Sequence, residues 1–295
     1  MTAMTPTLEA ARGTITAALE QTARAREEAP CGADPCHDPL CPVHAAATRE
    51  HLARTLWTPA PGAQPWQALQ EGTLALGSVL DHTILRPDAT PADIEAGCRQ
   101  ALELGCAAFC ANPVHVPLVA RLLAGSPVKV CTVVGFPLGA MPTALKVEET
   151  RWAVAQGAHE VDMVISVGMV REGLCGTVIE DIREVVRAAH EGGARCKVIL
   201  ETALLNDVEK ITVCLLAAHA GADFVKTSTG YSKSGATAGD VALMRLVVGD
   251  SLGVKAAGGI RTREQAVTML ESGANRIGTS SSLGIVHEHS PREGE

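Results

Sequence analysis

Eight short apolar runs, each followed by a stretch with helical periodicity, constrain the fold of this chain more than any other feature of its sequence. The runs lie at residues 80–84, 106–112, 128–134, 160–167, 196–202, 223–229, 253–257 and 275–280. Helical periodicity is clearest at 177–190, where one face collects Val178, Ile179, Ile182, Val185, Val186 and Ala189. Strands that alternate with helices indicate a parallel sheet with both faces covered.

The number of runs predicts the architecture of that sheet. Eight parallel strands close a (β/α)₈ or TIM barrel, so we predict an α/β fold of this class. The composition agrees, because 46% of the 295 residues are hydrophobic and only 2% are aromatic, which leaves aliphatic side chains to fill the core. A doubly wound open sheet is the alternative, although no G-x-G-x-x-G turn follows the first run.

The chain divides into three parts. Residues 1–65 form an N-terminal extension with helical stretches, a cysteine- and histidine-rich segment at 31–44 and a proline-rich linker at 58–65. We expect the barrel at 66–288 and a polar tail at 289–295. The segment at 31–44 holds potential zinc ligands, namely Cys31, Cys36, Cys41 and His44. Because their spacing is not that of the common paired-ligand sites, the alternative is a loop whose cysteines are incidental.

Charge and hydropathy argue against several classes of protein. A net charge of −8 argues against nucleic acid as a partner, because binding to a phosphate backbone needs a basic surface. No stretch of 18 or more apolar residues is present, so we expect no membrane partner. The N-terminus lacks a secretory signal pattern and most cysteines are scattered through apolar segments, which favours free thiols in the cytoplasm.

Three consecutive predicted strands each carry an ionisable residue inside an apolar run: Asp162, Lys197 and Lys226. Charge inside a barrel strand is costly unless it is paired or functional. Neighbouring strands lie ~4.8 Å apart, so these side chains converge if all three point inward. A structural ion pair is the alternative interpretation. Two lysines against one aspartate leave a net positive charge, which favours a functional site.

Convergence of these groups would permit Schiff-base chemistry. An amine with the reference pKa of ~10.4 is protonated at neutral pH and cannot attack a carbonyl. Burial and a second ammonium both lower that pKa, so one of the two lysines would be the nucleophile and the other would tune it. Asp162 can transfer protons. We expect no metal and no cofactor in the reaction, because the iminium itself accepts electrons.

Glycine and serine follow the last three predicted strands, at Gly230, at Gly258 and Gly259, and at Ser280 and Ser281. Exposed backbone N–H groups and hydroxyls at such ends suit a phosphate dianion. Barrels often bind phosphate at the loops after strands seven and eight. The pattern therefore predicts that this end of the barrel binds the phosphate group of a phosphorylated small molecule.

Seven motifs carry a family resemblance: Asp81-His82-Thr83, Asn112-Pro113, Val133-Val134-Gly135-Phe136-Pro137, Glu160-Val161-Asp162-Met163, Lys197-Val198-Ile199-Leu200-Glu201-Thr202, Lys226-Thr227-Ser228-Thr229-Gly230 and Lys255-Ala256-Ala257-Gly258-Gly259. In this order, from about Leu80 to Ser282, the chain resembles the deoxyribose-phosphate aldolases. The resemblance implies a lyase that cleaves 2-deoxy-D-ribose 5-phosphate reversibly to D-glyceraldehyde 3-phosphate and acetaldehyde.

The resemblance also implies roles for individual residues. Lys197 matches the Schiff-base lysine, Lys226 the lysine that lowers its pKa, and Asp162 the proton-transfer carboxylate. Asp81 is expected near Lys226. Further residues are expected to contact the substrate or its phosphate: Asp81, Thr83, Gly230, Gly258, Gly259, Ser280 and Ser281.

Two other functions stay open on the sequence. One is a Schiff-base aldolase that acts on a different phosphorylated aldehyde. The other is a non-catalytic protein that senses a sugar phosphate through the barrel and a metal through the segment at 31–44. Barrels of this kind commonly associate through their outer helices, so we expect a homodimer.

Overall fold

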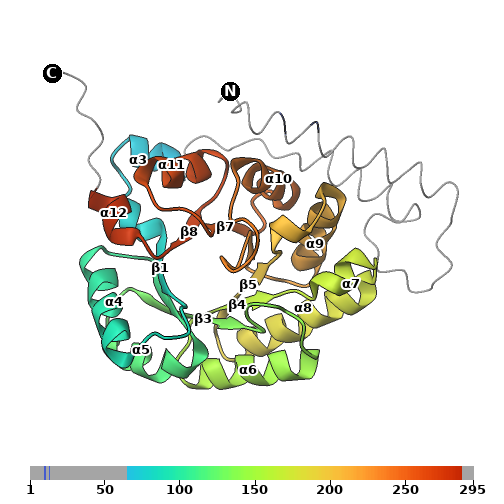
Figure 1. Ribbon diagram of the computed structural model, residues 1–295, viewed down its shortest axis with the longest axis horizontal. Helices are drawn as coiled ribbons and strands as arrows, with labels where there is room; N and C mark the ends of the chain where they lie inside the picture. The colour runs from blue at the N-terminus through green and yellow to red at the C-terminus, as the bar shows by residue number, and fades with distance from the viewer. Residues whose placement is uncertain (1–9, 11–12, 14–64, 288–295) are drawn as a thin grey trace, which may run out of the picture.

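The structure is a computed structural model that describes residues 10, 13 and 65–287. Eight parallel strands form a closed barrel in which each strand pairs with its neighbour in the chain and β8 pairs with β1 (Figure 1). The strands are β1 (Leu80–Ile84), β2 (Ala108–Ala111), β3 (Lys129–Val134), β4 (Glu160–Val164), β5 (Arg195–Ile199), β6 (Phe224–Lys226), β7 (Gly253–Ala257) and β8 (Arg276–Thr279). The predicted barrel is confirmed, and the open doubly wound sheet is excluded.

Each predicted apolar run overlaps one strand, and most strands are shorter than their run. The run at 223–229, for example, contains β6 over Phe224–Lys226. The residues after Lys226 leave the strand but keep part of its bonding, since Thr227 N donates to Lys255 O at 3.0 Å. Such residues form the edge of the barrel on which loops and a cavity are built.

Helices surround the barrel in Figure 1. The α-helices are α3 (Pro65–Gln70), α4 (Pro91–Glu103), α5 (Val116–Leu122), α6 (Thr143–Ala155), α7 (Val167–Arg171), α8 (Cys175–Glu191), α9 (Asp207–His219), α10 (Ala238–Val248), α11 (Arg263–Glu271) and α12 (Ser282–His287). Three short 3₁₀ helices are η1 (Leu76–Val79), η2 (Pro113–His115) and η3 (Thr202–Leu204). The predicted amphipathic stretch at 177–190 lies within α8, and its apolar face is buried.

Local sequence signals fix the starts of several helices. Thr90, Asn206 and Thr262 each accept a hydrogen bond from the backbone N–H three residues later, at the starts of α4, α9 and α11. In each case the side chain of that later residue accepts from the backbone N–H of the cap. This reciprocal arrangement is a capping box, which satisfies backbone donors that the first helical turn leaves open.

The barrel has two different cores. The space between strands and helices is aliphatic and includes Ile94, Ile182 and Leu246, each fully buried. The inner face is mixed: a small cluster formed by Leu85, Ala108, Cys110, Cys131 and Val133 lies beside a group of charged side chains. The apolar layer can hold the barrel together, so the interior is free to carry charge.

The predictions for residues 1–64 and 288–295 lie outside the described residues. They include the zinc ligands Cys31, Cys36, Cys41 and His44. The division into extension, barrel and tail stays a prediction, although α3 begins at Pro65, where we ended the linker. None of the helices in the described part of the chain combines the length and apolar character needed to span a bilayer.

Candidate active site

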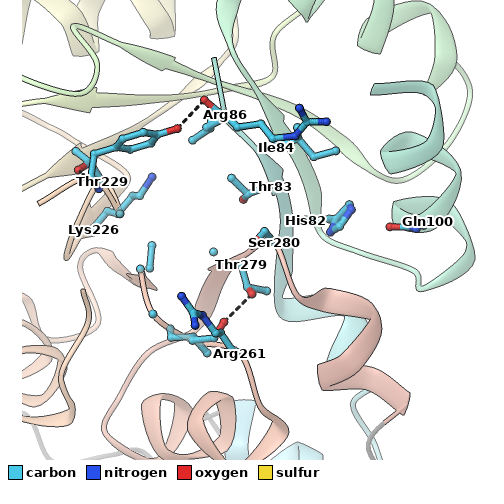
Figure 2. A pocket seen from close by; sticks show the side chains of 18 residues that line it. His82, Thr83, Ile84, Arg86, Gln100, Lys226, Thr229, Arg261, Thr279 and Ser280 are labelled. Carbon is cyan, nitrogen blue, oxygen red and sulfur yellow. Dashed lines mark hydrogen bonds between the residues drawn. The ribbon is translucent and has the colours of Figure 1, made fainter. Parts of the chain in front are cut away.

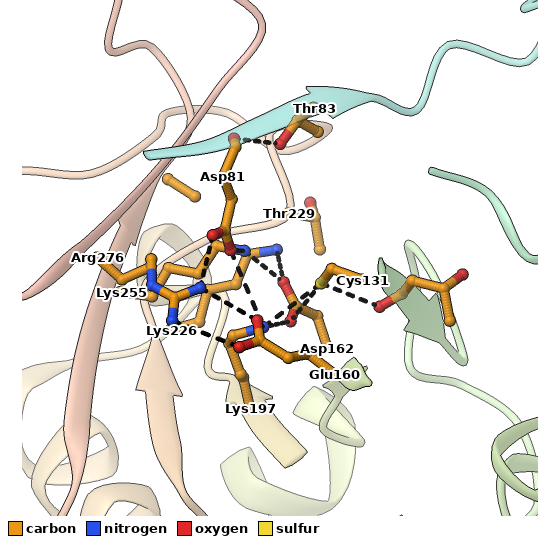
Figure 3. A network of polar contacts seen from close by, with 12 residues as sticks. Asp81, Thr83, Cys131, Glu160, Asp162, Lys197, Lys226, Thr229, Lys255 and Arg276 are labelled. Atoms are coloured by element: carbon orange, nitrogen blue, oxygen red, sulfur yellow. Dashed lines mark hydrogen bonds and ion pairs between the residues drawn. The ribbon is translucent and has the colours of Figure 1, made fainter. Parts of the chain in front are cut away.

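Charged side chains from six strands, β1 and β4 to β8, meet inside the barrel. Register partners on parallel strands face the same side of a sheet. Asp162 on β4 is the partner of Lys197 on β5, and Lys226 on β6 is the partner of Lys255 on β7. Lys255 is in turn the partner of Arg276 on β8. Figure 3 shows these side chains converging in the interior.

Asp162 is the centre of this group. Its Oδ1 atom accepts a hydrogen bond from Lys197 Nζ at 2.8 Å, and its Oδ2 atom accepts from Lys226 Nζ and Lys255 Nζ, each at 2.8 Å. All four side chains are buried. Burial alone would raise the pKa of Asp162, but the three ammonium groups lower it well below its ordinary value. The predicted set of Lys197, Lys226 and Asp162 is thus brought together around one carboxylate.

Asp81 is bound directly to Lys255 and not to Lys226, near which we expected it. Its Oδ2 atom accepts from Lys255 Nζ at 2.5 Å and its Oδ1 atom from Arg276 at 2.7 Å, whereas Lys226 binds Asp162. Lys255 reaches Asp81 across β8 at Gly278, where a Cβ would lie 3.0 Å from Lys255 Cε. Asp81 thus belongs to the same cluster as Lys226 but is joined to it through Lys255 and Asp162, because the missing side chain at Gly278 opens a path to β1.

Glu160 and Arg276 belong to the group, and the sequence analysis missed both. Glu160 Oε2 lies 2.5 Å from Lys197 Nζ, and Arg276 contacts both carboxylate oxygens of Glu160 at 3.1 and 3.4 Å. The signal was present, since Glu160 is two residues before Asp162 and so faces the same side of β4. Because charged side chains mostly face solvent, this alternation alone does not place Glu160 beside Lys197.

The charge balance around Lys197 differs from our expectation. Burial disfavours the ammonium, but the negative groups around it, Asp162 first and Glu160 among the others, raise the pKa of Lys197 well above its ordinary value. The expectation that a neighbouring cation leaves this amine neutral is wrong for this arrangement. That expectation rests on the positive charge of Lys226 and does not include the negative charges of Glu160 and Asp81.

A cavity of about 530 Å³ opens above this group, at the carboxyl ends of the strands (Figure 2). Among the predicted site residues, Thr83, Lys226, Gly230, Gly258, Gly259 and Ser280 line it. Lys197, Asp162, Asp81 and Ser281 do not belong to the lining. Lys226 therefore connects the buried charges with the cavity.

The rim of the cavity has glycines where other residues would be strained. Gly230, Gly258 and Gly259 have φ values of +89°, +88° and +78°, in the left-handed region that favours glycine. Gly235 packs so closely on this turn that a Cβ would lie 2.0 Å from Gly258 O. The close packing brings the backbone of two loops to the edge of the cavity.

Two arginines also line the cavity, and the sequence analysis did not name them. Arg86 follows β1 and forms ion pairs with Asp88 at 2.9 Å and Asp93 at 2.6 Å. Arg261 comes two residues after Gly259, and its side chain is exposed. The two aspartates balance the charge of Arg86, whereas Arg261 brings positive charge to the rim of the cavity, which suits an anionic ligand.

The first part of the loop after β6 is held by contacts of Thr229 and Tyr231. Glu201, a buried residue with φ +57°, accepts from the backbone N–H of Thr229 and from its hydroxyl. Tyr231 Oη donates to Leu85 O at 2.8 Å, and the ring of Tyr231 meets Phe136 edge-on at 5.5 Å. These contacts tie the loops after β1, β3 and β6 together above the lysines.

The family model of the DeoC/LacD family aldolases matches residues 78–286, which include all eight strands. The chain belongs to this family. It is 54% identical over 213 residues to the deoxyribose-phosphate aldolase of Thermococcus gammatolerans, an alignment that covers 72% of this chain and 95% of the relative. Its identity to deoxyribose-phosphate aldolase 1 of Bacillus licheniformis is 53% over 214 residues, covering 72% and 96%.

The fold of this DeoC/LacD family aldolase is also that of solved aldolase structures. Deoxyribose phosphate aldolase from Aeropyrum pernix, described as a unique tetramer, superposes with a TM-score of 0.69. The two sequences are 34% identical, and the match covers 77% of this chain and 98% of that one.

Proposed function

We propose that this protein is a deoxyribose-phosphate aldolase that cleaves 2-deoxy-D-ribose 5-phosphate reversibly through a Schiff base on Lys197. The products would be D-glyceraldehyde 3-phosphate and acetaldehyde. The observation that carries the proposal is the bonding of Lys197 and Lys226 to the two oxygens of Asp162, directly beneath a cavity with a glycine-rich rim. The names of the relatives from Thermococcus gammatolerans and Bacillus licheniformis support the same substrate.

The first step is the conversion of Lys197 into a nucleophile. Its ammonium transfers a proton to Asp162 Oδ1, which lies 2.8 Å from Nζ. The neutral amine attacks the C1 aldehyde of the open-chain sugar, and the carbinolamine loses water to give an iminium. Lys226 and Lys255 remain as cations on Asp162 Oδ2, so they favour a neutral Lys197 once its proton has left.

Bond cleavage follows from the iminium. Removal of the proton from the C3 hydroxyl breaks the C2–C3 bond, and its electron pair moves to the iminium to form an enamine. Glyceraldehyde 3-phosphate leaves at this point. Protonation of the enamine at C2 and addition of water to the resulting iminium release acetaldehyde and regenerate Lys197. Asp162, which is bound to Lys197, would carry these protons, directly or through water.

The rim of the cavity would hold the phosphate. Gly258 and Gly259 present a left-handed turn beside Ser280, and Arg261 follows on the same loop. Backbone N–H groups, a hydroxyl and a guanidinium are the donors that a phosphate dianion prefers. Thr83 is part of the same lining as Lys226, where the sugar hydroxyls would lie. Ser281, outside the lining, would act through the turn that its N–H makes with Thr279 Oγ1 at 2.9 Å.

The assembly and location of the protein are further parts of the proposal. A relative from Aeropyrum pernix is described as a tetramer, which supports self-association, and for this chain we propose a homodimer. Light scattering on the full chain tests the assembly. Seven cysteines of the described residues are free and buried, which suits the reducing cytoplasm that we propose as its location.

A coupled assay for release of glyceraldehyde 3-phosphate from 2-deoxyribose 5-phosphate, with and without chelator, tests the proposed function. We expect Lys197→Met to reduce turnover by more than about a thousandfold. The matched control is Lys146→Met, because Lys146 is also fully buried but pairs with Asp181 at 2.6 Å in the helical layer. Phosphosugar binding without turnover in the wild type would instead support a non-catalytic sensor.

A further inference from the structure

Lys197 lies below the cavity and not in its wall. Its side chain is fully buried and is not part of the lining, whereas Lys226 lines the cavity. A nucleophile has to come within about 3–3.5 Å of the carbon that it attacks. If Lys197 forms the Schiff base, as the proposed function requires, its amino group has to rise from its resting position.

Two carboxylates lie within 2.8 Å of the resting ammonium, and they differ in their surroundings. Asp162 is shared among Lys197, Lys226 and Lys255, each bound at 2.8 Å. Glu160 lies closer to Lys197, at 2.5 Å, and its other contact is with the guanidinium of Arg276. Asp162 is therefore the shared counter-ion of three lysines, whereas Lys197 is the one lysine among them that Glu160 contacts.

Glu160 lies on the side of Lys197 that faces away from the cavity. Glu160 and Arg276 are the first residues of β4 and β8, whereas the cavity opens at the carboxyl ends of the strands. Arg276 fixes Glu160 with two contacts and stacks over the ring of Phe224 at 5.4 Å. The carboxylate is thus held at the base of the barrel and cannot follow Lys197 upward.

We propose that Glu160, held by Arg276, is a positioning residue that keeps the resting Lys197 ammonium retracted beneath the cavity. The inference rests on the proposed function of Lys197. Attraction between Glu160 and Lys197 depends on the positive charge, so it ends when the amine gives up its proton. Loss of the proton then both activates the amine and frees it to move into the cavity.

Other charged and titratable groups also face Lys197, so the effect of Glu160 has to be separated from theirs. They come from β1, β3, β4, β6, β7 and β8 and comprise Asp81, Cys131, Asp162, Lys226, Lys255 and Arg276. Substitution of Glu160 leaves the three lysines bound to Asp162. It removes one negative charge at 2.5 Å from Lys197, which favours the neutral amine at lower pH.

The test follows the rate at which borohydride traps acetaldehyde on Lys197 as a function of pH, with the full chain. We expect Glu160→Gln to shift the rise in trapping to lower pH by roughly one to three units. Glu160→Asp, which keeps the charge, should remain close to the wild type. The matched control is Asp181→Asn, because Asp181 is a buried partner of a different lysine, Lys146. It should lower stability and leave the profile unmoved.

Arg276→Met provides a test in the opposite direction. It removes a cation from Glu160 and from the surroundings of Lys197, so the rise in trapping should move to higher pH. If both Glu160→Gln and Arg276→Met lose stability while their profiles match the wild type, Glu160 is merely structural and the inference is overturned.

The resting position of Lys197 can also be tested on the wild-type protein, so that this test does not depend on whether a variant folds. Trace acetylation with acetic anhydride, in the absence of substrate, should modify Lys226 before Lys197, because Lys226 lines the cavity. Acetylation of Lys197 first would contradict a retracted resting position. The two proposals can fail separately, since absence of trapping in the wild type counts against the proposed function and acetylation still reports the position of Lys197.

Discussion

Lys226 and Lys255 donate to the same atom of Asp162, since each Nζ lies 2.8 Å from Oδ2. Two ammonium groups on one carboxylate oxygen, with Lys197 on the other, make Asp162 the main counter-charge of the barrel interior. We expect Asp162→Asn to lower kcat by about 10²–10⁴, because proton transfer to and from Lys197 is lost. Steady-state kinetics with 2-deoxyribose 5-phosphate measures this.

The same substitution tests the structural importance of Asp162. Removing one partner of a buried ion pair typically costs about 3–5 kcal/mol, so unfolding by urea should show a large loss. Unchanged stability together with unchanged kcat would mean that Asp162 is neither the counter-charge nor the proton carrier.

Gly253 is a position where the packing of the barrel base forbids a side chain. A Cβ there would lie 2.1 Å from two atoms of the Phe224 ring, whose face also carries Arg276. We expect Gly253→Ala to lower the free energy of unfolding by about 1–3 kcal/mol through overpacking. The matched control is Gly239→Ala in α10, where nothing lies within 4 Å and alanine should stabilise by about 0.5–1 kcal/mol. Equal effects in urea unfolding would refute this account of the base.

Tyr231 links two loops that are distant in sequence. Its hydroxyl donates to Leu85 O at 2.8 Å, and its ring meets Phe136 edge-on. We expect Tyr231→Phe to lower the free energy of unfolding by about 0.5 kcal/mol, the low end for a hydrogen bond, because the side chain is half exposed. Tyr231→Ala should cost more, since it also loses the ring contact. Thermal unfolding measures both, and identical values for the two variants would show that the ring contributes nothing.

His82 gives the stability of the protein a pH dependence. It is buried beside Ser282 Oγ, at 3.0 Å from Nδ1, and burial lowers its pKa from the ordinary 6.5. Below that value the unfolded chain takes up a proton that folded His82 resists, so the free energy of unfolding falls as pH decreases. The contribution is fully present above pH 6.5.

The matching experiment compares urea unfolding of the wild type and His82→Gln between about pH 8 and pH 5. The wild type should lose more stability than the variant on acidification, by up to ~1.4 kcal/mol per pH unit for one proton. If His82→Gln loses as much stability on acidification as the wild type, or more, His82 is not the cause of the pH dependence.

The strand order and the meeting of Asp162, Lys197 and Lys226 could be predicted from the sequence for one reason. The alternation of side chains along a strand determines which residues point to the same face of the sheet. In a closed barrel of eight strands, the order of the apolar runs in the sequence is also the order of neighbouring strands. Both properties are local in the sequence. They place residues on a face but do not determine how far a long side chain reaches.

The differences at the site arise because the sequence pattern does not give the reach of long side chains. Lys255 binds Asp81 because Gly278 on the strand between them has no side chain, and no motif position encodes this. Glu160 was missed because charged side chains mostly face solvent, so its place at the start of β4 does not by itself indicate a contact with Lys197. Since Glu160 approaches Lys197, the expected pKa of that lysine had the wrong direction. In a closed interior the pKa of one group depends on every charged group nearby, so a prediction that includes only some of these groups can have the wrong direction.

The most direct measurement traps acetaldehyde on the wild-type protein with borohydride and locates the adduct by peptide mass spectrometry. An amine that can become neutral and reach the cavity forms an iminium that borohydride reduces to a stable secondary amine. We predict that the adduct lies on Lys197 and is lost in Lys197→Met but not in Lys146→Met. An adduct on Lys226 that persists in Lys197→Met, or the absence of any adduct, would contradict the account.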